Sequence, residues 1–395
     1  MEKSTIRAFQ SVLRTFSFKK EPKTFSEDFA IKRYHKKMQE PDMVKQEQLA
    51  ESCWTQWLSF DRTLPTNLIL PNSIWYKVRA RIHQDFRNAK TRYFACSDFR
   101  FPKGSQFEPN RGRTSVEAML CQRRWTCTPE NFEAFASLVY RVHGLRKAAK
   151  QRYKQWFEHH DFDISMSKAD ALLYRKFSKS EHGVGFSVFK WKLERTVSFE
   201  RGSRFSTVPK NNEKRRPINI ECFANVLTQS QIGEGLRSLL RKEYMIDLDT
   251  LAHIHGLKIQ DVDRWATIDL QNASDSVSKA LVRFLFPEWF VLELESRASP
   301  YVLGPDGIYY DTHKISAMGN GFTFELMTYI LVCLCVEYDP LGSSFGDDIV
   351  IHPEKAPDVI KALESVGFVI NTDKSFISGD FRESCGANYH RHEGY

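Results

Sequence analysis

The stretch Ser343-Ser-Phe-Gly-Asp-Asp-Ile-Val-Ile351 decides the fold that we predict for this chain. Gly346 and Asp347 favour a tight turn, because glycine tolerates turn dihedrals and aspartate hydrogen-bonds to its own backbone. The following run, Ile349-Val-Ile351, is continuously apolar, which is typical of a strand buried on both faces of a sheet. We therefore expect a β-hairpin with the carboxylates of Asp347 and Asp348 at its tip. A solvated surface turn is the alternative interpretation of the same tripeptide.

A third carboxylate is expected beside this turn. Asp269 lies near the end of the strand-like run Trp265-Ala-Thr-Ile-Asp-Leu270, and the helix-opening stretch Asn272-Ala-Ser-Asp-Ser276 follows it. Neighbouring carboxylates repel each other unless a cation lies between them. Asp269, Asp347 and Asp348 are therefore candidate metal ligands, and such a group suggests catalysis by two metal ions on phosphate.

The order of elements after residue 260 predicts an α+β fold. A hairpin should turn at Gly304-Pro-Asp-Gly307, Pro287 should restart a helix, and Gly367 should end another. We expect strands at 265–270 and 368–370, the latter as the last strand of the sheet, a glycine-rich loop at 316–321, and helices from about 274, at 322–336 and at 355–366. Two helices would then pack on one face of an antiparallel sheet, in a βαββαβ-like order.

Charge divides the chain into a basic and an acidic part. Residues 1–240 contain 44 Lys and Arg against 25 Asp and Glu, whereas residues 241–395 contain 13 against 24. This division is typical of a protein that holds a polyanion with one part and concentrates divalent cations in the other. An accident of surface composition is the alternative. We predict an N-terminal lead-in of unknown role at 1–60, a basic region at 61–240 and a motif-bearing region at 241–395.

Several classes of protein are disfavoured by the sequence. The eight cysteines include no C-x-x-C pair, which argues against a zinc ribbon and against a disulfide framework. The longest apolar stretch, Met327 to Val336, is ten residues and too short to span a bilayer. The first residues lack the apolar core of a signal peptide. We expect reduced thiols in a cytosolic protein that makes no use of a membrane.

The segment Val208-Pro-Lys-Asn-Asn-Glu-Lys-Arg-Arg-Pro-Ile218 is predicted to be a loop that clamps a triphosphate. It gathers four basic side chains around one acid: Lys210, Lys214, Arg215 and Arg216. Such cations neutralise the charge that develops as pyrophosphate leaves. A basic surface loop is the alternative. The basic and aromatic segment 141–157 can also hold phosphates, although a solvated amphipathic helix with inward aromatic rings is the simpler interpretation.

Five segments in order resemble the motifs of the RNA-dependent RNA polymerase (replicase) subunits of the single-stranded RNA bacteriophages, the leviviruses. They are Ala266-Thr-Ile-Asp-Leu-Gln-Asn-Ala-Ser-Asp-Ser-Val-Ser278 (motif A), Ser316-Ala-Met-Gly-Asn-Gly-Phe-Thr-Phe-Glu-Leu326 (motif B), Phe345-Gly-Asp-Asp-Ile349 (motif C), Val366-Gly-Phe-Val-Ile-Asn-Thr-Asp-Lys-Ser-Phe376 (motif D) and Ser378-Gly-Asp-Phe-Arg-Glu-Ser-Cys-Gly-Ala387 after it. The likeness runs from about residue 205 to the end. It implies a right-handed polymerase with fingers, palm and thumb that copies an RNA template.

The resemblance also assigns roles to the acidic residues. Asp269 and Asp347 would bridge two Mg²⁺ ions, with Mn²⁺ as a substitute, and Asp348 would support them. One ion would activate the primer 3′-hydroxyl, and the other would stabilise the leaving pyrophosphate. Lys374, in the motif D position, would be the general acid for pyrophosphate. An ordinary exposed lysine beside Asp373 is the alternative.

Motif B would contact the template or product. Gly319 and Gly321 flank Asn320, so that the loop could approach a template or nascent base without an intervening Cβ. Thr323 completes the motif as Gly-x-x-x-Thr.

The ribose would be read by Asp275, which resembles the residue that recognises the 2′-hydroxyl of the incoming nucleotide. Many viral RNA polymerases carry an Asn as its partner, where this chain has Met327. Asn320 and Ser276 are therefore the candidate partners.

The resemblance implies RNA template, nascent RNA and ribonucleoside triphosphates as ligands. It also implies host elongation factors Tu and Ts and a ribosomal protein as partners in the bacterial cytoplasm.

Family members continue into a thumb, whereas this chain stops at His390-Arg-His-Glu-Gly-Tyr395, so we expect a truncated product. A divergent lineage with a minimal thumb is the alternative. Template-directed nucleotidyl transfer is the leading hypothesis. One alternative hypothesis is an inert RNA-binding protein with a palm fold. Another is a reverse transcriptase, but the sequence of motif B argues against it.

Overall fold

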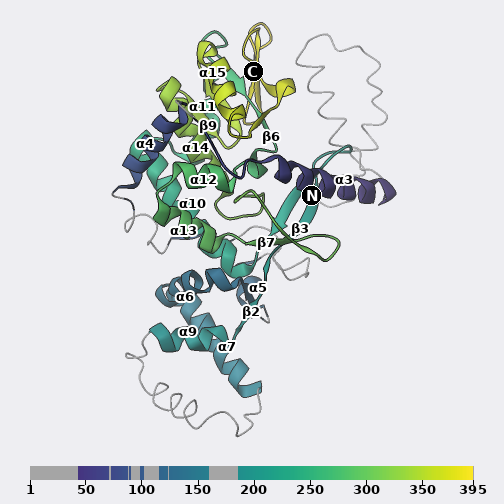
Figure 1. Cartoon of the computed structure of the whole chain (residues 1–395), viewed down its shortest axis with the longest axis vertical. Helices are drawn as coiled ribbons and strands as arrows, with labels where there is room; N and C mark the ends of the chain where they lie inside the picture. Colours follow the sequence, from purple (N-terminus) through teal and green to yellow (C-terminus); the bar gives the residue numbers. More distant parts are fainter. Residues whose placement is uncertain are drawn as a thin grey trace.

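The protein is described here by a computed structural model that covers residues 43–70, 73–87, 89, 98–101, 115–122, 124–159 and 186–394. Helices α6 (Phe132–Arg141), α7 (His143–His159) and α9 (Phe186–Glu194) gather at one end of the molecule, and the elements after residue 248 gather mainly toward the other (Figure 1). Helix α10 (Phe223–Tyr244) connects the two, because its first residues pack in one hydrophobic core and its later residues in a second.

The predicted hairpin with the two aspartates is confirmed. Strands β9 (Ser343–Phe345) and β10 (Asp348–Ile351) pair antiparallel around Gly346 and Asp347. On its other edge β10 pairs antiparallel with β5 (Ala266–Ile268). Ile349 and Ile351 belong to the main core, whereas Val350 packs in a small cluster on the opposite face. The strand is therefore buried on both faces, as its unbroken apolar sequence predicted.

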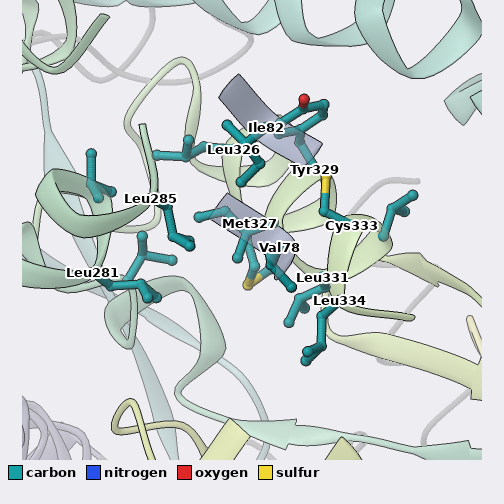
Figure 2. Packing of buried hydrophobic residues seen from close by; sticks show 14 of the residues in the cluster. Val78, Ile82, Leu281, Leu285, Leu326, Met327, Tyr329, Leu331, Cys333 and Leu334 are labelled. Carbon is teal, nitrogen blue, oxygen red and sulfur yellow. The ribbon is translucent and has the colours of Figure 1, made fainter. Parts of the chain in front are cut away.

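Two helices accompany this sheet, and the α+β class is confirmed. Helix α14 (Thr323–Tyr338) contacts β9 and also α15 (Ala356–Glu364), and both helices add apolar side chains to the main core. α14 is apolar on nearly all sides, which suits a helix buried in the centre of a domain. Figure 2 shows it packing against α4 (Trp75–Phe86) and α12 (Lys279–Leu285), through Val78, Ile82, Leu281, Leu285, Leu326, Met327 and Leu331.

The strand predicted at 265–270 is interrupted at Asp269. β5 ends at Ile268, and β6 (Leu270–Gln271) pairs with β11 (Val369–Ile370) in a separate two-stranded sheet. The backbone of Asp269 is held by other partners: its N–H donates to the Ser375 hydroxyl, and its carbonyl accepts from the Asn371 N–H. The chain therefore changes sheets at this residue.

Two features differ from the sequence prediction, and a third agrees with it. The helix expected from 274 begins only at Lys279, after the 3₁₀ turn η2 (Ala273–Asp275), because Ser278 caps α12 by accepting from the Leu281 N–H. Pro287 precedes α13 (Glu288–Arg297), as predicted for a restart. The strand at 368–370 is not the last, because the hairpin β12 (Phe381–Ser384) and β13 (Ala387–His390) follows it.

A second sheet has the order β4–β3–β7–β8. The predicted hairpin at 301–310 is present as β7 (Tyr301–Leu303) and β8 (Tyr309–Asp311). The segment 208–218, predicted to be a loop, is mostly strand: β3 (Gly202–Pro209) pairs with β4 (Arg215–Ile220), and only 210–214 connects them. The ladder continues up to the pairing of Pro209 with Arg215 next to the turn, so the basic residues lie on a defined hairpin.

The basic region has its own core. It contains the parallel pair β1 (Trp125–Cys127) and β2 (Val197–Phe199), the short helices α5 (Val116–Leu120) and η1 (Pro129–Asn131), and α6, α7 and α9. The helix expected at 141–157 is confirmed as α7, and Tyr153 packs inward and stacks on Trp156 at 5.7 Å between ring centroids. Its proposed contact with phosphates stays a prediction.

Two region boundaries drawn from charge fall inside helices. Helix α3 (Met43–Thr63) runs through residue 60, and α10 runs through residue 240. α3 packs on β4, so residues 43–60 of the predicted lead-in belong to the folded body. Residues 1–42 lie outside the described part of the chain.

Within the described ranges, no helix has both the length and the apolar character needed to cross a membrane. The cysteines that the structure describes are free thiols.

Candidate active site

Most of the predicted site residues line one cavity of about 850 Å³ between α3, the basic hairpin β3–β4, the loop before α14 and the tip of the β9–β10 hairpin. The residues that it brings together are Asp269, Asp347, Asp348, Lys374, Lys210, Lys214, Arg215, Arg216, Asp275, Gly319, Asn320 and Thr323. Two predicted residues, Ser276 and Gly321, do not line this cavity.

Strand register brings the three carboxylates together. Ile268 of β5 pairs antiparallel with Ile349 of β10. Asp269, which follows Ile268, therefore lies opposite Asp348, which precedes Ile349. Burial, together with the nearby charges of Asp347 and Asp269, raises the pKa of Asp348 to about 7. Burial also raises the pKa of Asp269. Both carboxyl groups therefore lie where negative charge is costly unless a cation compensates for it.

Gly346 fixes the geometry of the turn. Its φ of +62° lies in the left-handed region, and a Cβ at this position would be 2.7 Å from the Phe324 ring. Its N–H donates to the Thr328 hydroxyl at 2.9 Å. A glycine is thus required both by the backbone and by the close approach of α14, and the turn presents Asp347 in a fixed place.

Asp269 has two further neighbours. The Asn371 side-chain amide donates to Asp269 Oδ1 at 2.5 Å, and Lys374 Nζ lies 3.7 Å from Asp269 Oδ2. Lys374 Nζ also lies 3.6 Å from Glu383 Oε1 on β12. Asn371 follows β11 within the motif D segment, and Glu383 lies in the segment 378–387 after it, so both belong to stretches that the sequence had marked without naming these residues.

Oxygen ligands of this kind suit hard divalent cations such as Mg²⁺ and Mn²⁺. Among the residues that the structure describes, no group of three or more His, Cys, Asp or Glu side chains is already arranged to hold a metal ion. The residue types and the raised pKa values of two carboxyls fit a divalent cation, whereas the present side-chain positions leave Asp269 paired with Asn371 and Lys374.

The basic hairpin faces the carboxylates across the cavity. Burial lowers the pKa of Lys210, and the charges of Arg216 and Lys374 lower it further, while Asp269 opposes them. Arg215 is fixed along the hairpin, because its Nε donates to the Thr207 hydroxyl at 2.6 Å. Lys214 and Arg216 also line the cavity. The cluster can therefore bind an anion next to the carboxylates.

The glycines of the loop at 316–321 have a packing role within the protein, and their predicted contact with template or product stays a prediction. A Cβ on Gly319, whose φ is +107°, would lie 2.1 Å from the Asn219 carbonyl oxygen. A Cβ on Gly321 would lie 2.8 Å from the Val226 carbonyl oxygen on α10. These glycines let the loop pack against β4 and α10, so their close approach is to the protein itself.

Asn320 and Thr323 hold the same loop in shape while lining the cavity. Asn320 Oδ1 accepts from the Phe322 N–H at 2.9 Å. The Thr323 hydroxyl donates to the Ala317 carbonyl at 2.8 Å and accepts from the Ala317 N–H at 3.2 Å. The carboxamide nitrogen of Asn320 is then the group that can face a ligand.

Asp275 is buried at the cavity wall. Its Oδ1 accepts from Trp57 Nε1 at 2.9 Å and lies 3.0 Å from Lys314 Nζ. The sequence did not indicate Trp57 or Lys314, since neither belongs to a motif. Ser276, predicted as a partner in ribose reading, is fully buried and donates to the Asn272 carbonyl, so it does not reach the cavity in this conformation.

A family model described as RNA replicase, beta-chain, matches residues 168–394. The chain is 41% identical over 193 residues to the RNA-directed RNA polymerase subunit beta of Enterobacteria phage SP, covering 46% of this chain and 33% of that protein. It is 41% identical over 194 residues to the protein of the same name from Escherichia virus Qbeta, covering 47% and 33%. It is 39% identical over 198 residues to the RNA-directed RNA polymerase beta chain of Escherichia phage MS2, covering 48% and 36%.

The match thus spans about a third of the length of these curated relatives. Among solved structures, the RNA-dependent RNA polymerase of a human picorbirnavirus aligns with a TM-score of 0.34 and 15% identity, over 48% of this chain and 43% of that one. An insertion loop deletion mutant of that polymerase aligns with a TM-score of 0.35 and 12% identity, over 85% and 76%.

Proposed function

Because the chain belongs to the RNA replicase beta-chain family, we propose that it is the catalytic part of an RNA-directed RNA polymerase. The proposed reaction is template-directed nucleotidyl transfer from ribonucleoside triphosphates to the 3′ end of a growing RNA. The observation that carries the proposal is the single cavity that brings the carboxylates of motifs A and C together with the basic hairpin.

The proposed cofactor is a pair of Mg²⁺ ions, replaceable by Mn²⁺, held by Asp269, Asp347 and Asp348. When bound, they would activate the primer 3′-hydroxyl and neutralise the charge of the leaving pyrophosphate. The raised pKa values of Asp348 and Asp269 support this assignment, because a cation offsets the cost of burying two negative charges. Asn371 orients Asp269 through the hydrogen bond at 2.5 Å.

The remaining lining residues are proposed to bind the substrates. Lys210, Lys214, Arg215 and Arg216 would hold the triphosphate, and the Asn320 amide would face the nucleotide. Gly319 and Thr323 would support the surface that contacts template and product, with Gly321 acting indirectly through its packing on α10. Lys374, close to Asp269, would donate a proton to pyrophosphate.

The architecture that we propose is that of a polymerase hand, with the β5–β10–β9 sheet and its helices as palm, and the basic region as fingers. RNA template and nascent RNA would lie in the cavity. By family resemblance we propose host elongation factors Tu and Ts and a ribosomal protein as partners, in the cytoplasm of the bacterial host.

The test is Asp347→Asn in the full chain, assayed by extension of a short hairpin RNA with ribonucleotides and Mg²⁺. Loss of one metal-binding carboxylate should remove Mg²⁺-dependent incorporation, while a labelled RNA should bind within about twofold of the unmodified protein. Asp358→Asn is the matched control, because Asp358 lies in the first turn of α15 and does not line the cavity. Near-normal incorporation by the Asp347 variant would contradict the assignment.

The second candidate function is that of an RNA-binding protein with an inert palm. It is favoured by one observation: among the described residues the carboxylates are not yet arranged as a metal site, and Asp269 is paired with Lys374. This alternative predicts that the unmodified chain shifts RNA in a gel but extends no primer with Mg²⁺ or Mn²⁺.

A further inference from the structure

A buried lysine lies directly behind Asp275. The Lys314 residue is 3% exposed, and its Nζ lies 3.0 Å from Asp275 Oδ1 and 4.0 Å from Asp61 Oδ1. The same nitrogen lies 3.5 Å from the ring centroid of Trp57, which adds a cation–π contact. Burying a lysine is costly unless it is paired, so this cluster is held by several mutual contacts.

Helix α3 supplies the other half of the cluster. Trp57 and Asp61 are four residues apart and therefore lie on one face of the helix. Trp57 Nε1 donates to Asp275 Oδ1 at 2.9 Å. Asp61 accepts from the His313 N–H at 3.0 Å and the Lys314 N–H at 3.3 Å. The helix thereby fixes both Asp275 and the backbone that carries Lys314.

Asp275 has one hydrogen-bond donor, Trp57 Nε1, and one ion-pair partner, Lys314 Nζ. Asp275 and Trp57 line the large cavity, whereas Lys314 lines a second cavity of about 20 Å³ behind the motif B loop. Both contacts fall on Oδ1, and no hydrogen bond from the described residues reaches Oδ2. Oδ2 is therefore the oxygen left to accept from a ligand in the cavity.

Charge and orientation both depend on this arrangement. Burial raises the pKa of Asp275, and the neighbouring Lys314 opposes that rise. Without the cation the carboxyl would tend to hold a proton and become a weaker acceptor. Without the indole N–H it would lose one of the two contacts that fix its rotation. Met327, at the cavity wall, carries no group that could replace either donor.

We propose that Lys314 and Trp57 are positioning residues for ribose selection, which hold Asp275 as an oriented acceptor for the 2′-hydroxyl of the incoming nucleotide. This inference rests on the proposed polymerase function and deepens it. A site built to accept a hydrogen bond from a hydroxyl discriminates against the analogue that lacks it. The substrates compared are therefore a ribonucleoside triphosphate and its 2′-deoxy analogue.

The test measures kcat and KM for ATP and dATP in extension of a hairpin RNA by the full chain. Lys314→Met removes the charge and keeps an unbranched side chain, and Trp57→Phe removes the N–H and keeps a ring. Each should lower the preference for ATP by about 10-fold, through a higher KM for ATP, while KM for dATP stays unchanged. A general loss of structure would instead affect both nucleotides.

Matched controls exist for both variants. Lys279 Nζ also lies 3.0 Å from an aspartate, Asp311, but neither lines the cavity, so Lys279→Met should keep the preference. Trp54 stacks on Trp57 at 5.4 Å and does not line the cavity, so Trp54→Phe should keep it too.

The outcomes separate two failures. If Asp275→Asn abolishes the preference while both positioning variants stay within twofold of the unmodified protein, the inference is overturned and the proposed role of Asp275 stands. If Asp275→Asn itself leaves the preference unchanged, the ribose-reading role fails, and the inference fails with it. If Lys314→Met does not yield folded protein, the test depends on Trp57→Phe. An unchanged preference for ATP over dATP in that variant would overturn the proposal.

Discussion

Lys374 lies between two acids, Asp269 at 3.7 Å and Glu383 at 3.6 Å, and its side chain is 45% exposed at the rim of the cavity. A general acid needs a proton and a position near the leaving group. The two carboxylates fix the position of the Lys374 side chain, and the basic hairpin that would bind the triphosphate lies across the same cavity. These contacts distinguish Lys374 from an ordinary surface lysine.

We therefore predict that Lys374→Gln lowers the single-turnover rate of nucleotide incorporation by about 100-fold, because general acid catalysis typically contributes 10² to 10⁴ in rate. The RNA affinity should change little. Lys361→Gln, in the last turn of α15 and away from the cavity, is the matched control. A variant rate within threefold of the unmodified protein would exclude the general-acid role.

The residues of the site were predictable where a local pattern marks them. The Gly-Asp-Asp turn lies before an unbroken apolar strand, and Asp269 follows the strand-like run 265–268. The sequence did not predict the cluster formed by Trp57, Asp61 and Lys314. Trp57 and Asp61 contact the segment that carries Lys314 only in the folded protein, because more than 250 residues of sequence separate them from it. A lysine in a polar stretch normally indicates solvent, and nothing local shows that this one is buried.

At the scale of elements, the predictions succeeded where one periodicity dominates. The run from 323 to 335 is apolar enough to specify the buried helix α14, and Gly304-Pro-Asp-Gly307 specifies the turn between β7 and β8. The segment 208–218 was misjudged, because its Pro, Asn and charged residues resemble a loop, whereas pairing with the preceding strand makes it a hairpin. The parallel pairing of β3 with β7 is a long-range contact that no local pattern encodes.

The junction between β4 and α10 gives a prediction about pH. Burial raises the pKa of Glu221 from 4.5 to about 7, although the Ser299 hydroxyl donates to its Oε2 at 2.5 Å. Between these two values the folded protein binds a proton that the unfolded chain has lost, so this contribution to stability is present at low pH and is lost as the pH rises through 7.

The free energy of unfolding should therefore fall by about 2 kcal/mol from pH 5.5 to pH 8 through this group. In urea unfolding at these two pH values, Glu221→Gln should be less sensitive to pH than the unmodified protein by that amount, because a neutral amide does not titrate. Glu354→Gln, an exposed position in η3 (Pro353–Lys355), should retain the full dependence. Equal dependence in the Glu221 variant and the unmodified protein would show that Glu221 ionises normally.

At the scale of the whole molecule, the division of charge coincides with the two sides of the cavity. The basic hairpin belongs to the part of the chain with a net charge of +19, and the three carboxylates belong to the part with −11. Helix α10 runs through both hydrophobic cores and so fixes these parts relative to each other. A polyanion can then be held on one side while cations concentrate on the other.

This arrangement predicts which charges contribute to the binding of RNA. Each phosphate neutralised by a lysine or arginine steepens the salt dependence of binding, with a slope of about −0.7 per contact for a single strand. Lys214→Gln combined with Arg216→Gln should therefore reduce the slope of log K against log salt by about 1.4, measured by fluorescence anisotropy with a labelled single-stranded RNA. Lys355→Gln combined with Lys361→Gln removes the same charge from the acidic part and should leave the slope unchanged. If both double variants changed the slope equally, net charge alone would govern the binding, and the basic hairpin would have no specific contact with RNA.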